Sequence, residues 1–588
     1  MPQMEGKRTT AAWGDGGGNA VRDAVDYRGC PADRSATGGW VAAALVLGIE
    51  LCERLSTMGI AVNLVTYLTS TMHLPSAAAA NVVTDFMGTS FLLCLLAGFL
   101  ADSFLGRYLT IAVFALVQAI GTSLLAVTTL LHQLRPAAPG EPASSLQMGV
   151  LYACLYLIAL GTGGLKSSVS GFGTDQFDDR DDRERAAMGL FFNRFFFFIS
   201  LGTLAAVTVL VYVQDHVGRS WAYGICAAAM LAAIAVFLSG TRRYRYKRSS
   251  GSPIVHILQV LVAAARKRGV KRPVNAAALY EDRVDEHARV PHTPQFAWLD
   301  NAAVMVGEED NEVVVASGDG RMATAPNPWR ICSVSRVEEV KMVARLMPVW
   351  ATTILFWTIY AQMITFSVEQ ATTMDRRIGG VFEIPAASLT VFFVGAIMIT
   401  LAVYDRVFIP LCRTLTGKQG FTNLEKIGIG LALSILGMVA AALCEKKRLA
   451  VAFAAGNTNT NGNTALPISV FLLTPQFLLV GAGEAFIYTG QLDFFITRSP
   501  KGMKTMSTGL FLTTLSLGFF LSSALVSVVK GATTWLADTI DRSRLDYFYW
   551  LLAVLSVINL AAYLVCAMWA RAKPEQQPTA VADADDKC

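Results

Sequence analysis

The chain has 588 residues, of which 53% are hydrophobic and 16% are charged, and its formal net charge is +5. The charged fraction is well below the roughly 25% of soluble domains, and a soluble protein of this length would divide into domains with charged surfaces. The apolar residues instead gather into blocks close to the ~20 residues that cross a bilayer as a helix. The composition therefore excludes an ordinary soluble protein and indicates a chain that spans a membrane many times.

Twelve apolar blocks follow one another along the chain. Six are closely spaced, a polar stretch of about 100 residues intervenes, and six more follow. The blocks lie near residues 40–70, 77–101, 107–132, 147–170, 188–213, 219–240, 343–366, 386–408, 425–444, 466–496, 505–530 and 546–570. Two six-helix halves joined by a long connector match the major facilitator architecture, whose halves enclose a central site. We therefore expect an all-α membrane protein of twelve transmembrane helices.

The distribution of lysine and arginine predicts the orientation of the chain, because cytoplasmic loops are rich in both. The connector opens with the basic run Thr241-Arg-Arg-Tyr-Arg-Tyr-Lys-Arg248, whereas the short loops at 71–76 and 133–146 carry a single arginine. Lys446-Lys447-Arg448 breaks the rule locally on the expected outer side. The expected segments are a cytoplasmic N-terminal tail (1–38), an N-terminal six-helix bundle (39–240), a cytoplasmic connector (241–342), a C-terminal six-helix bundle (343–571) and a cytoplasmic C-terminal tail (572–588).

The connector contains one segment with helical periodicity. Residues 253–268 place Ile254, Ile257, Leu258 and Leu261 on one stripe, which predicts an amphipathic helix along the membrane surface. Residues 306–328 are rich in Gly, Asp, Glu and Pro and are expected to be mobile. The basic clusters of the connector serve as topology signals, and anionic lipid is their alternative partner.

Three ionisable residues stand near the middle of the first block. Glu50, Glu53 and Arg54 are spaced i, i+3 and i+4, so one helix face carries all three. Such charges cost several kcal/mol in hydrocarbon unless they pair or face water. The pattern indicates a functional site; an ion triad that only fixes helix packing is the alternative.

Two more charges lie in other blocks. Lys166 follows a glycine-rich stretch of the fourth block, and Glu484 lies in the tenth. Lys166 needs a carboxylate partner unless it reaches the membrane interface. Three acids and two bases nearly balance, so protonation of one acid would free a cation to bind a solute or release a helix. A proton gradient could in this way drive a solute, because both ligands bias one conformational equilibrium.

At these residues the sequence resembles the plant nitrate/peptide transporter family, the proton-dependent oligopeptide transporter branch of the major facilitators. Glu50-Leu-Cys-Glu53-Arg54 matches the ExxER motif of that family, and the resemblance extends over roughly residues 25–572. Other segments that resemble the family or its dual-affinity nitrate transporter subgroup are Asp102-Ser-Phe-Leu-Gly-Arg-Tyr-Leu109, Gly173-Thr-Asp-Gln-Phe177, Phe191-Phe-Asn-Arg-Phe-Phe-Phe-Phe-Ile-Ser200, Val211-Tyr-Val-Gln-Asp-His-Val-Gly218 and Tyr488-Thr-Gly-Gln-Leu-Asp-Phe-Phe495.

The resemblance implies roles for the same charges. Glu50, Glu53 and Arg54 would couple protons, Lys166 would be their salt-bridge partner, and Glu484 would line the pocket of the second half, with Arg54 also attracting an anionic substrate. Protons would be the coupling ion, and no cofactor or metal is expected. Plasma-membrane location is implied by the family alone.

The seventh block departs from the subgroup. Tyr360 stands where the subgroup has its nitrate-binding histidine, and Ile364 stands where it has a lining threonine. A protonated histidine adds a positive charge, whereas tyrosine offers one neutral hydroxyl donor. Chloride therefore becomes a rival of nitrate, and Tyr360 either contacts the anion or only lines the site.

The subgroup also has a phosphorylated threonine that tunes affinity, and Ser103 stands at this position. A serine can accept phosphate, so a kinase acting at Ser103 is an expected partner; capping of the following turn is the alternative role. The resemblance leaves a homodimer open, membrane lipid is an expected partner, and no nucleic acid is expected.

These features predict a proton-coupled secondary active symporter of small inorganic anions, nitrate and/or chloride, that works by alternating access. One alternative keeps the machinery and carries di- or tripeptides or another organic solute, with Glu484 holding the amino terminus. A second alternative is a nitrate sensor whose transport is incidental. An enzyme is not expected, because the sequence has no P-loop, HExxH or catalytic-triad signature.

Overall fold

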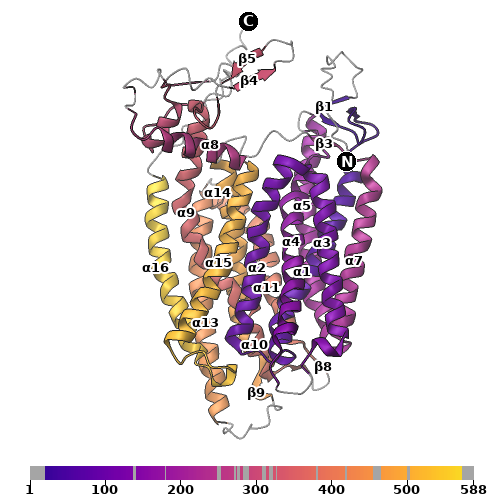
Figure 1. Cartoon of the computed structure of the whole chain (residues 1–588). Helices are drawn as coiled ribbons and strands as arrows, with labels where there is room; N and C mark the ends of the chain where they lie inside the picture. The colour runs from indigo at the N-terminus through magenta and orange to yellow at the C-terminus, as the bar shows by residue number, and fades with distance from the viewer. Residues whose placement is uncertain are drawn as a thin grey trace.

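The structure is a computed structural model. It describes residues 20–136, 141–178, 181–247, 253–270, 273, 279–281, 290–306, 313–316, 322–325, 327–378, 382–416, 420–454, 465–498 and 504–571. The expected tails 1–38 and 572–588 and the segment 306–328 therefore lie partly or wholly outside the described residues. The molecule is a tall bundle of long helices with small sheets at both ends (Figure 1).

The first half of the bundle contains the helices up to residue 239. They are α1 (Gly39–Ser70), α2 (Ser76–Leu100), α3 (Gly106–Leu130), α4 (Ser145–Thr174), α5 (Asp182–Ala205), α6 (Val211–His216) and α7 (Arg219–Ser239). A π-helical turn, η3 (Ala206–Leu210), joins α5 to α6 as one crossing. Within this half, α3 and α4 pack together, α2 also lies on α4, and α1 lies against α5 and α7.

The second half begins at residue 334. Its helices are α9 (Val334–Ile364), α10 (Phe366–Thr372), α11 (Thr390–Val403), α12 (Ile409–Thr416), α13 (Asn423–Ala454), α14 (Thr474–Arg498), α15 (Lys504–Ala532) and α16 (Leu545–Arg571). The pair α9–α10 forms one crossing, and α11–α12 forms another through the π-helical turn η10 (Tyr404–Phe408). The two halves meet where α2 packs against α15, and α5 against α11.

Gly106 reverses the chain between α2 and α3. Residues Ser76–Leu130 form one apolar helical run of 55 residues, which would extend about 80 Å if it were straight, far beyond the ~30 Å hydrocarbon layer. A π-helical turn, η1 (Ala101–Leu105), ends α2, and Gly106 then adopts φ 74°. Backbone at this angle is strained for residues with a side chain, so the glycine permits the turn and the run makes two crossings.

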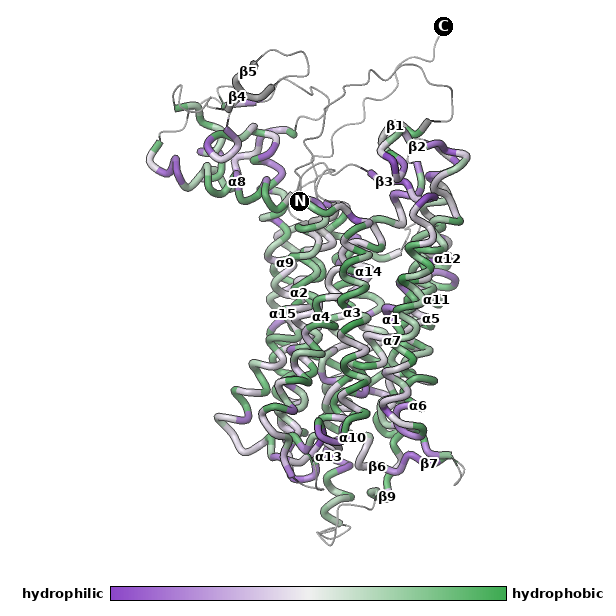
Figure 2. The backbone as a smooth tube through the Cα atoms, turned by 45° about the vertical axis from the view of Figure 1, so that its right-hand side comes forward, coloured by the Kyte–Doolittle hydropathy of each residue, from purple (hydrophilic) through white to green (hydrophobic). Residues whose placement is uncertain are grey.

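Membrane-length helices make up the bundle. The described residues contain ten helical runs that are long and apolar enough to cross a membrane, and one of these runs holds both α2 and α3. Helix α1 has 32 residues but is not among the ten runs, and its middle turns carry Glu50, Glu53 and Arg54. With α1 and the divided run, the bundle has the twelve crossings that the sequence predicts. Figure 2 shows hydrophobic residues along the bundle and hydrophilic ones gathered toward its ends.

At one end of the bundle, three strands join the N-terminal segment to the start of the connector. Strand β1 (Ala20–Val25) pairs antiparallel with β2 (Pro31–Asp33) and with β3 (Tyr246–Lys247). The connector also contains α8 (Pro253–Arg266), the 3₁₀ helix η7 (Ala297–Ala303) and the hairpin of β4 (Val313–Ala316) and β5 (Met322–Ala325). In Figure 1, the labelled elements β1, β3, α8, β4 and β5 lie at the same end of the bundle.

Helix α8 forms within the predicted segment, and the face that it buries in the protein is a different one from the stripe predicted to lie along the membrane surface. It packs on η7 and α9 through Val260, Ala263 and Ala264, which are at most 1% exposed. Leu258 and Leu261 are 47% and 36% exposed. The small alanines allow the close contact with η7, so the connector buries this face and leaves the two leucines outside.

At the opposite end, short strands tie loops of the second half together. Strand β6 (Met374–Asp375) pairs parallel with β9 (Leu466–Ser469), and β7 (Arg377–Ile378) pairs antiparallel with β8 (Phe382–Glu383). Arg448 also lies at this end, fully buried and 2.8 Å from both Glu445 and Asp541. The basic run that breaks the charge rule thus contains an arginine that is neutralised within the fold. Arg448 therefore does not count among the loop charges that predict orientation.

Candidate functional site

Helix α1 carries the predicted ionisable face in the middle of the bundle. The Arg54 Nε lies 3.0 Å from Glu50 Oε1 and 3.5 Å from Glu53 Oε2. Glu50 and Glu53 are only 1% and 0% exposed, whereas the Arg54 side chain keeps 20% of its surface accessible. One helix face therefore holds both carboxylates behind a cation that remains partly accessible.

Lys166 of α4 completes the cluster. Its Nζ lies 3.4 Å from Glu53 Oε1, and its side chain is 4% exposed. The glycine-rich stretch before it lets α3 approach α4 closely, because a Cβ at Gly164 would lie only 2.1 Å from the ring of Phe114. Lys166 is thus buried and paired with Glu53, and it does not extend to the membrane interface.

Neutral side chains hold Glu53 in place. The Thr57 hydroxyl donates to Glu53 Oε1 over 2.8 Å, lies 3.1 Å from the Thr162 hydroxyl, and accepts from Gln118 Nε2 at 3.2 Å. Sequence reasoning did not find these three residues. Thr57 follows Glu53 by one helical turn, which is the one signal that the sequence offered.

The four charged residues balance to zero formal charge. Two carboxylates face two cations, and Glu53 contacts both cations. A buried pair of this kind is costly to break, because removal of one partner leaves the other charge without compensation. Protonation of either carboxyl would leave one cation in excess, and an anionic ligand bound at the same time would restore neutrality.

The second half contributes a carboxylate that has no salt bridge to any residue that the structure describes. Glu484 of α14 lies opposite the cluster, and its Oε2 is buried without a hydrogen-bond partner among the described residues. Arg54 lies close enough to Glu484 for an electrostatic interaction. It also interacts electrostatically with Tyr488, which lies one turn later on α14. The Tyr488 ring also meets Phe196 of α5 edge-on, with ring centroids 6.3 Å apart. Both halves therefore meet around Arg54.

Tyr360 and Ile364 lie on α9 in the same central region. Tyr360 is 9% exposed and Ile364 is 2% exposed. The Tyr360 ring packs edge-on against Phe393 and Phe519 at 5.3 and 5.8 Å. Both Glu484 and Arg54 act electrostatically on Tyr360. Tyr360, which replaces the histidine of the subgroup, thus lies close to charged residues of both halves. Phe393 and Phe519 form an aromatic frame around it.

Ser103 lies in the π-helical turn between α2 and α3. Its Oγ is buried and has no hydrogen-bond partner among the described residues. In the same turn region, Arg107 bonds Asp175 over 2.7 Å and reaches the Gly171 carbonyl. A kinase could reach the Ser103 hydroxyl only if this turn opened.

A contact between the halves at the end opposite the connector was not predicted. The Ser76 hydroxyl at the start of α2 hydrogen-bonds Glu369 of α10, and the Ser76 N–H donates to the Asp538 carbonyl over 3.1 Å. Glu369 is 5% exposed. The signal in the sequence was an acid three residues beyond the seventh apolar block, but its partner is 293 residues away.

Comparison with known proteins places this arrangement in a family. The family model described as PTR2, the POT family, matches residues 108–541. The Arabidopsis thaliana protein NRT1/PTR FAMILY 6.2 is 65% identical over 560 residues, which cover 93% of this chain and 95% of the relative. NRT1/PTR FAMILY 6.3 from the same plant is 53% identical over 567 residues, with 93% and 94% covered.

Solved structures show the same fold. The POT family transporter PepTSo aligns with a TM-score of 0.65 at 20% identity over 91% of this chain and 99% of that one. An auto-inhibited POT family peptide transporter aligns with a TM-score of 0.64 at 21% identity, covering 91% and 98%. The predicted family and the predicted major facilitator fold are therefore confirmed. The chain belongs to the POT family of membrane transporters, together with the plant NRT1/PTR proteins.

Proposed function

We propose that the chain is a proton-coupled symporter of small inorganic anions, nitrate and/or chloride, that works by alternating access in the plasma membrane. The observation that carries this proposal is the neutral cluster of Glu50, Glu53, Arg54 and Lys166 in the centre of the bundle. Two carboxylates that can bind protons balance the two cations of this cluster. The net charge of the anion site therefore depends on whether a carboxylate is protonated.

The coupling follows from charge balance. A proton that binds Glu50 or Glu53 leaves Arg54 or Lys166 with an excess positive charge, and an anion restores neutrality. The loaded cluster then carries no net charge, so the halves can close around it and open on the other side at little electrostatic cost. Return of the unloaded carrier requires the original ion pairs. Proton and anion therefore move together.

Arg54 is the proposed direct ligand of the anion. Its guanidinium is the most accessible of the four charged groups and faces the second half, where Tyr360 lies. Tyr360 would donate one neutral hydrogen bond, while Ile364 offers an apolar wall. A site with one hydroxyl donor makes fewer demands on anion geometry than a charged imidazole, so we propose that chloride competes with nitrate.

One observation favours the peptide alternative. Glu484 leaves a buried carboxylate oxygen without a hydrogen-bond partner in the described part of the chain. A carboxylate in one half and a guanidinium in the other could hold the two ends of a dipeptide. The aromatic frame of Tyr360, Phe393 and Phe519 argues for a smaller solute.

Uptake in oocytes tests the proposal. Labelled chloride, nitrate and a dipeptide are offered separately at acidic and at neutral external pH, with water-injected cells as the control. We expect acid-stimulated uptake of one or both anions and none of the dipeptide. Acid-stimulated uptake of the dipeptide alone would establish the alternative, and anion uptake that ignores pH would exclude proton coupling. Transport-dead protein that still alters nitrate responses in plants would indicate a sensor.

Phosphorylation of Ser103 by a kinase is the proposed regulation of this transporter. Two negative charges in the turn next to Arg107 would compete with Asp175 for that arginine. Mass spectrometry of the purified protein, followed by uptake kinetics of Ser103→Ala and Ser103→Asp, tests this step.

A further inference from the structure

A cavity of about 470 Å³ lies at the connector end of the first half, far from the charge cluster of α1. It is bordered by the start of α1, the start of α5 and the chain leading into β3. Four arginines line it, Arg34, Arg183, Arg243 and Arg245, against one acid, Glu184. None of these side chains takes part in the proposed transport chemistry.

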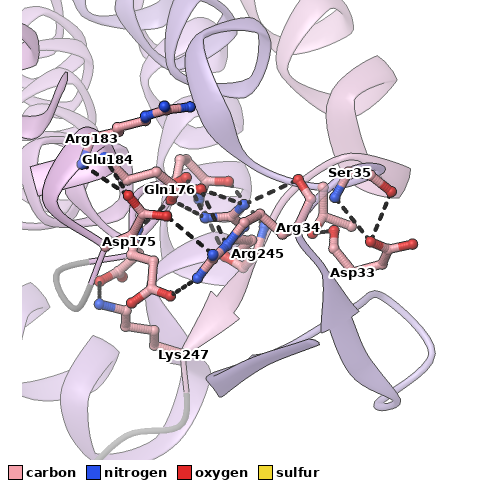
Figure 3. Close-up of polar contacts among 12 residues, drawn as sticks. Asp33, Arg34, Ser35, Asp175, Gln176, Arg183, Glu184, Arg245 and Lys247 are labelled. Atoms are coloured by element: carbon pink, nitrogen blue, oxygen red, sulfur yellow. Dashed lines mark hydrogen bonds and ion pairs between the residues drawn. The ribbon is translucent and has the colours of Figure 1, made fainter. Parts of the chain in front are cut away.

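Two of the arginines form the fixed floor of the cavity. Arg245 is 1% exposed and reaches Glu184 at 2.7 Å and the Gln176 carbonyl at 3.1 Å. Its Nε is buried with no hydrogen-bond partner among the described residues. Arg34 bonds Asp178 over 2.6 Å and Asp181 over 3.1 Å. These contacts hold both guanidinium groups in place (Figure 3).

The other two arginines supply the excess charge. Arg183 and Arg243 are exposed, and no salt bridge to either is found within the part of the chain that the structure describes. Figure 3 shows the Arg183 guanidinium without a contact among the residues drawn. Asp178, Asp181 and Glu184 form their ion pairs with Arg34 and Arg245, so three acids stand against four arginines. The cavity therefore keeps one net positive charge, placed on its accessible rim.

The position of the cavity indicates where its ligand comes from. Trp40, the second residue of the membrane helix α1, lines the cavity and packs under Arg194 with the guanidinium carbon 4.0 Å from the ring centroid. Tryptophan and arginine together are typical of the membrane interface. Basic pockets at this level between membrane helices bind phosphorylated lipid headgroups, and arginine forks fit phosphate oxygens in a bidentate manner.

We propose that this cavity binds a phosphomonoester anion, with Arg183 and Arg243 contacting the phosphate at the rim above the floor that Arg34 and Arg245 form. The headgroup of a phosphoinositide in the adjacent leaflet and a soluble inositol phosphate share this chemistry. A bound phosphate would join the start of α1 to α5 and to the connector. The proposal does not depend on which solute the protein carries.

Binding of a fluorescent short-chain phosphatidylinositol bisphosphate to the purified full-length protein tests the proposal, with phosphatidylcholine as the reference lipid. The double variant Arg183→Ala/Arg243→Ala should bind roughly 30-fold more weakly, since each basic side chain near a phosphate contributes about fivefold. Arg242→Ala/Arg268→Ala removes the same charge from exposed positions outside the cavity and should bind like the wild type.

Soluble inositol trisphosphate distinguishes the two sources. If it displaces the lipid, the free phosphomonoester occupies the site; if only the lipid binds, the membrane supplies the ligand. The proposal is overturned if the wild type binds neither probe above the phosphatidylcholine level, or if the two double variants lose affinity equally. Single variants Arg183→Gln and Arg243→Gln, with thermal melts of the unliganded proteins, provide the same comparison should the double variant fold poorly.

Discussion

Replacement of Glu53 by glutamine is the sharpest perturbation of the charge cluster. Glu53 is fully buried and contacts Lys166 at 3.4 Å and Arg54 at 3.5 Å. Glutamine has nearly the same shape and can still accept the Thr57 hydrogen bond. The substitution therefore removes one negative charge and one proton acceptor while the packing is kept.

The size of the effect follows from the charges that remain. Two cations then face Glu50 alone, and Lys166 loses its carboxylate partner. Removing one member of a buried ion pair costs about 3–5 kcal/mol, which shifts a two-state equilibrium by more than about 100-fold. The unloaded carrier bears this cost, because its return needs neutral ion pairs. We expect gradient-driven accumulation to fall to the passive level.

Two modes of transport separate this loss from misfolding. Uptake of labelled chloride and nitrate is measured with an imposed proton gradient and, separately, as exchange with equal anion on both sides. Exchange does not need the unloaded carrier to return, so Glu53→Gln should retain it. Glu383→Gln is the matched control, because Glu383 pairs with Arg376 on an exposed loop and is 48% accessible. Surface labelling confirms equal expression.

Acid-stimulated accumulation by Glu53→Gln at the wild-type level would refute the assignment of Glu53 as a coupling group. Loss of both accumulation and exchange, with normal surface expression, would show that Glu53 maintains the fold of the cluster and would also contradict the reasoning above.

Three further predictions follow from the same geometry. Tyr360→His should raise nitrate uptake relative to chloride, because imidazole can add a positive charge beside the anion; an unchanged ratio, with Tyr360→Phe as the control, would mean that position 360 does not touch the anion. Measured at a pH at which Glu484 is ionised, Glu484→Gln should tighten anion binding about fivefold by removing a negative charge that opposes it, and a higher half-saturation concentration would instead favour the peptide alternative. Arg448→Gln should lower the melting temperature of the purified protein, since it strands Glu445 at a cost of about 3–5 kcal/mol; a melting temperature equal to that of the wild type would contradict the buried network.

The charge cluster of α1 was predictable because its determinants are local. Spacing alone placed Glu50, Glu53 and Arg54 on one helix face, and a helix is regular enough for that inference to hold. That Lys166 reaches Glu53 was an expectation from the resemblance, and the distance of 3.4 Å agrees with it. The functional roles of these residues remain predictions.

The contacts that escaped prediction depend on tertiary structure. Arg448 looked like a loop charge on the wrong side, but it pairs with Asp541, which lies 93 residues later. No local pattern encodes such a pairing. The contact of α8 with η7 likewise escaped prediction, because the alanines that pack on η7 carry little hydrophobic signal, whereas the exposed Leu258 and Leu261 carry much.

Proton movement during anion entry tests the central claim most directly. Purified protein is reconstituted into liposomes that contain a trapped pH indicator, and chloride or nitrate is then added outside, with an impermeant anion as the control. Proton-coupled symport predicts acidification of the interior that follows anion entry and disappears in Glu53→Gln. Anion entry without any change in interior pH would contradict the account.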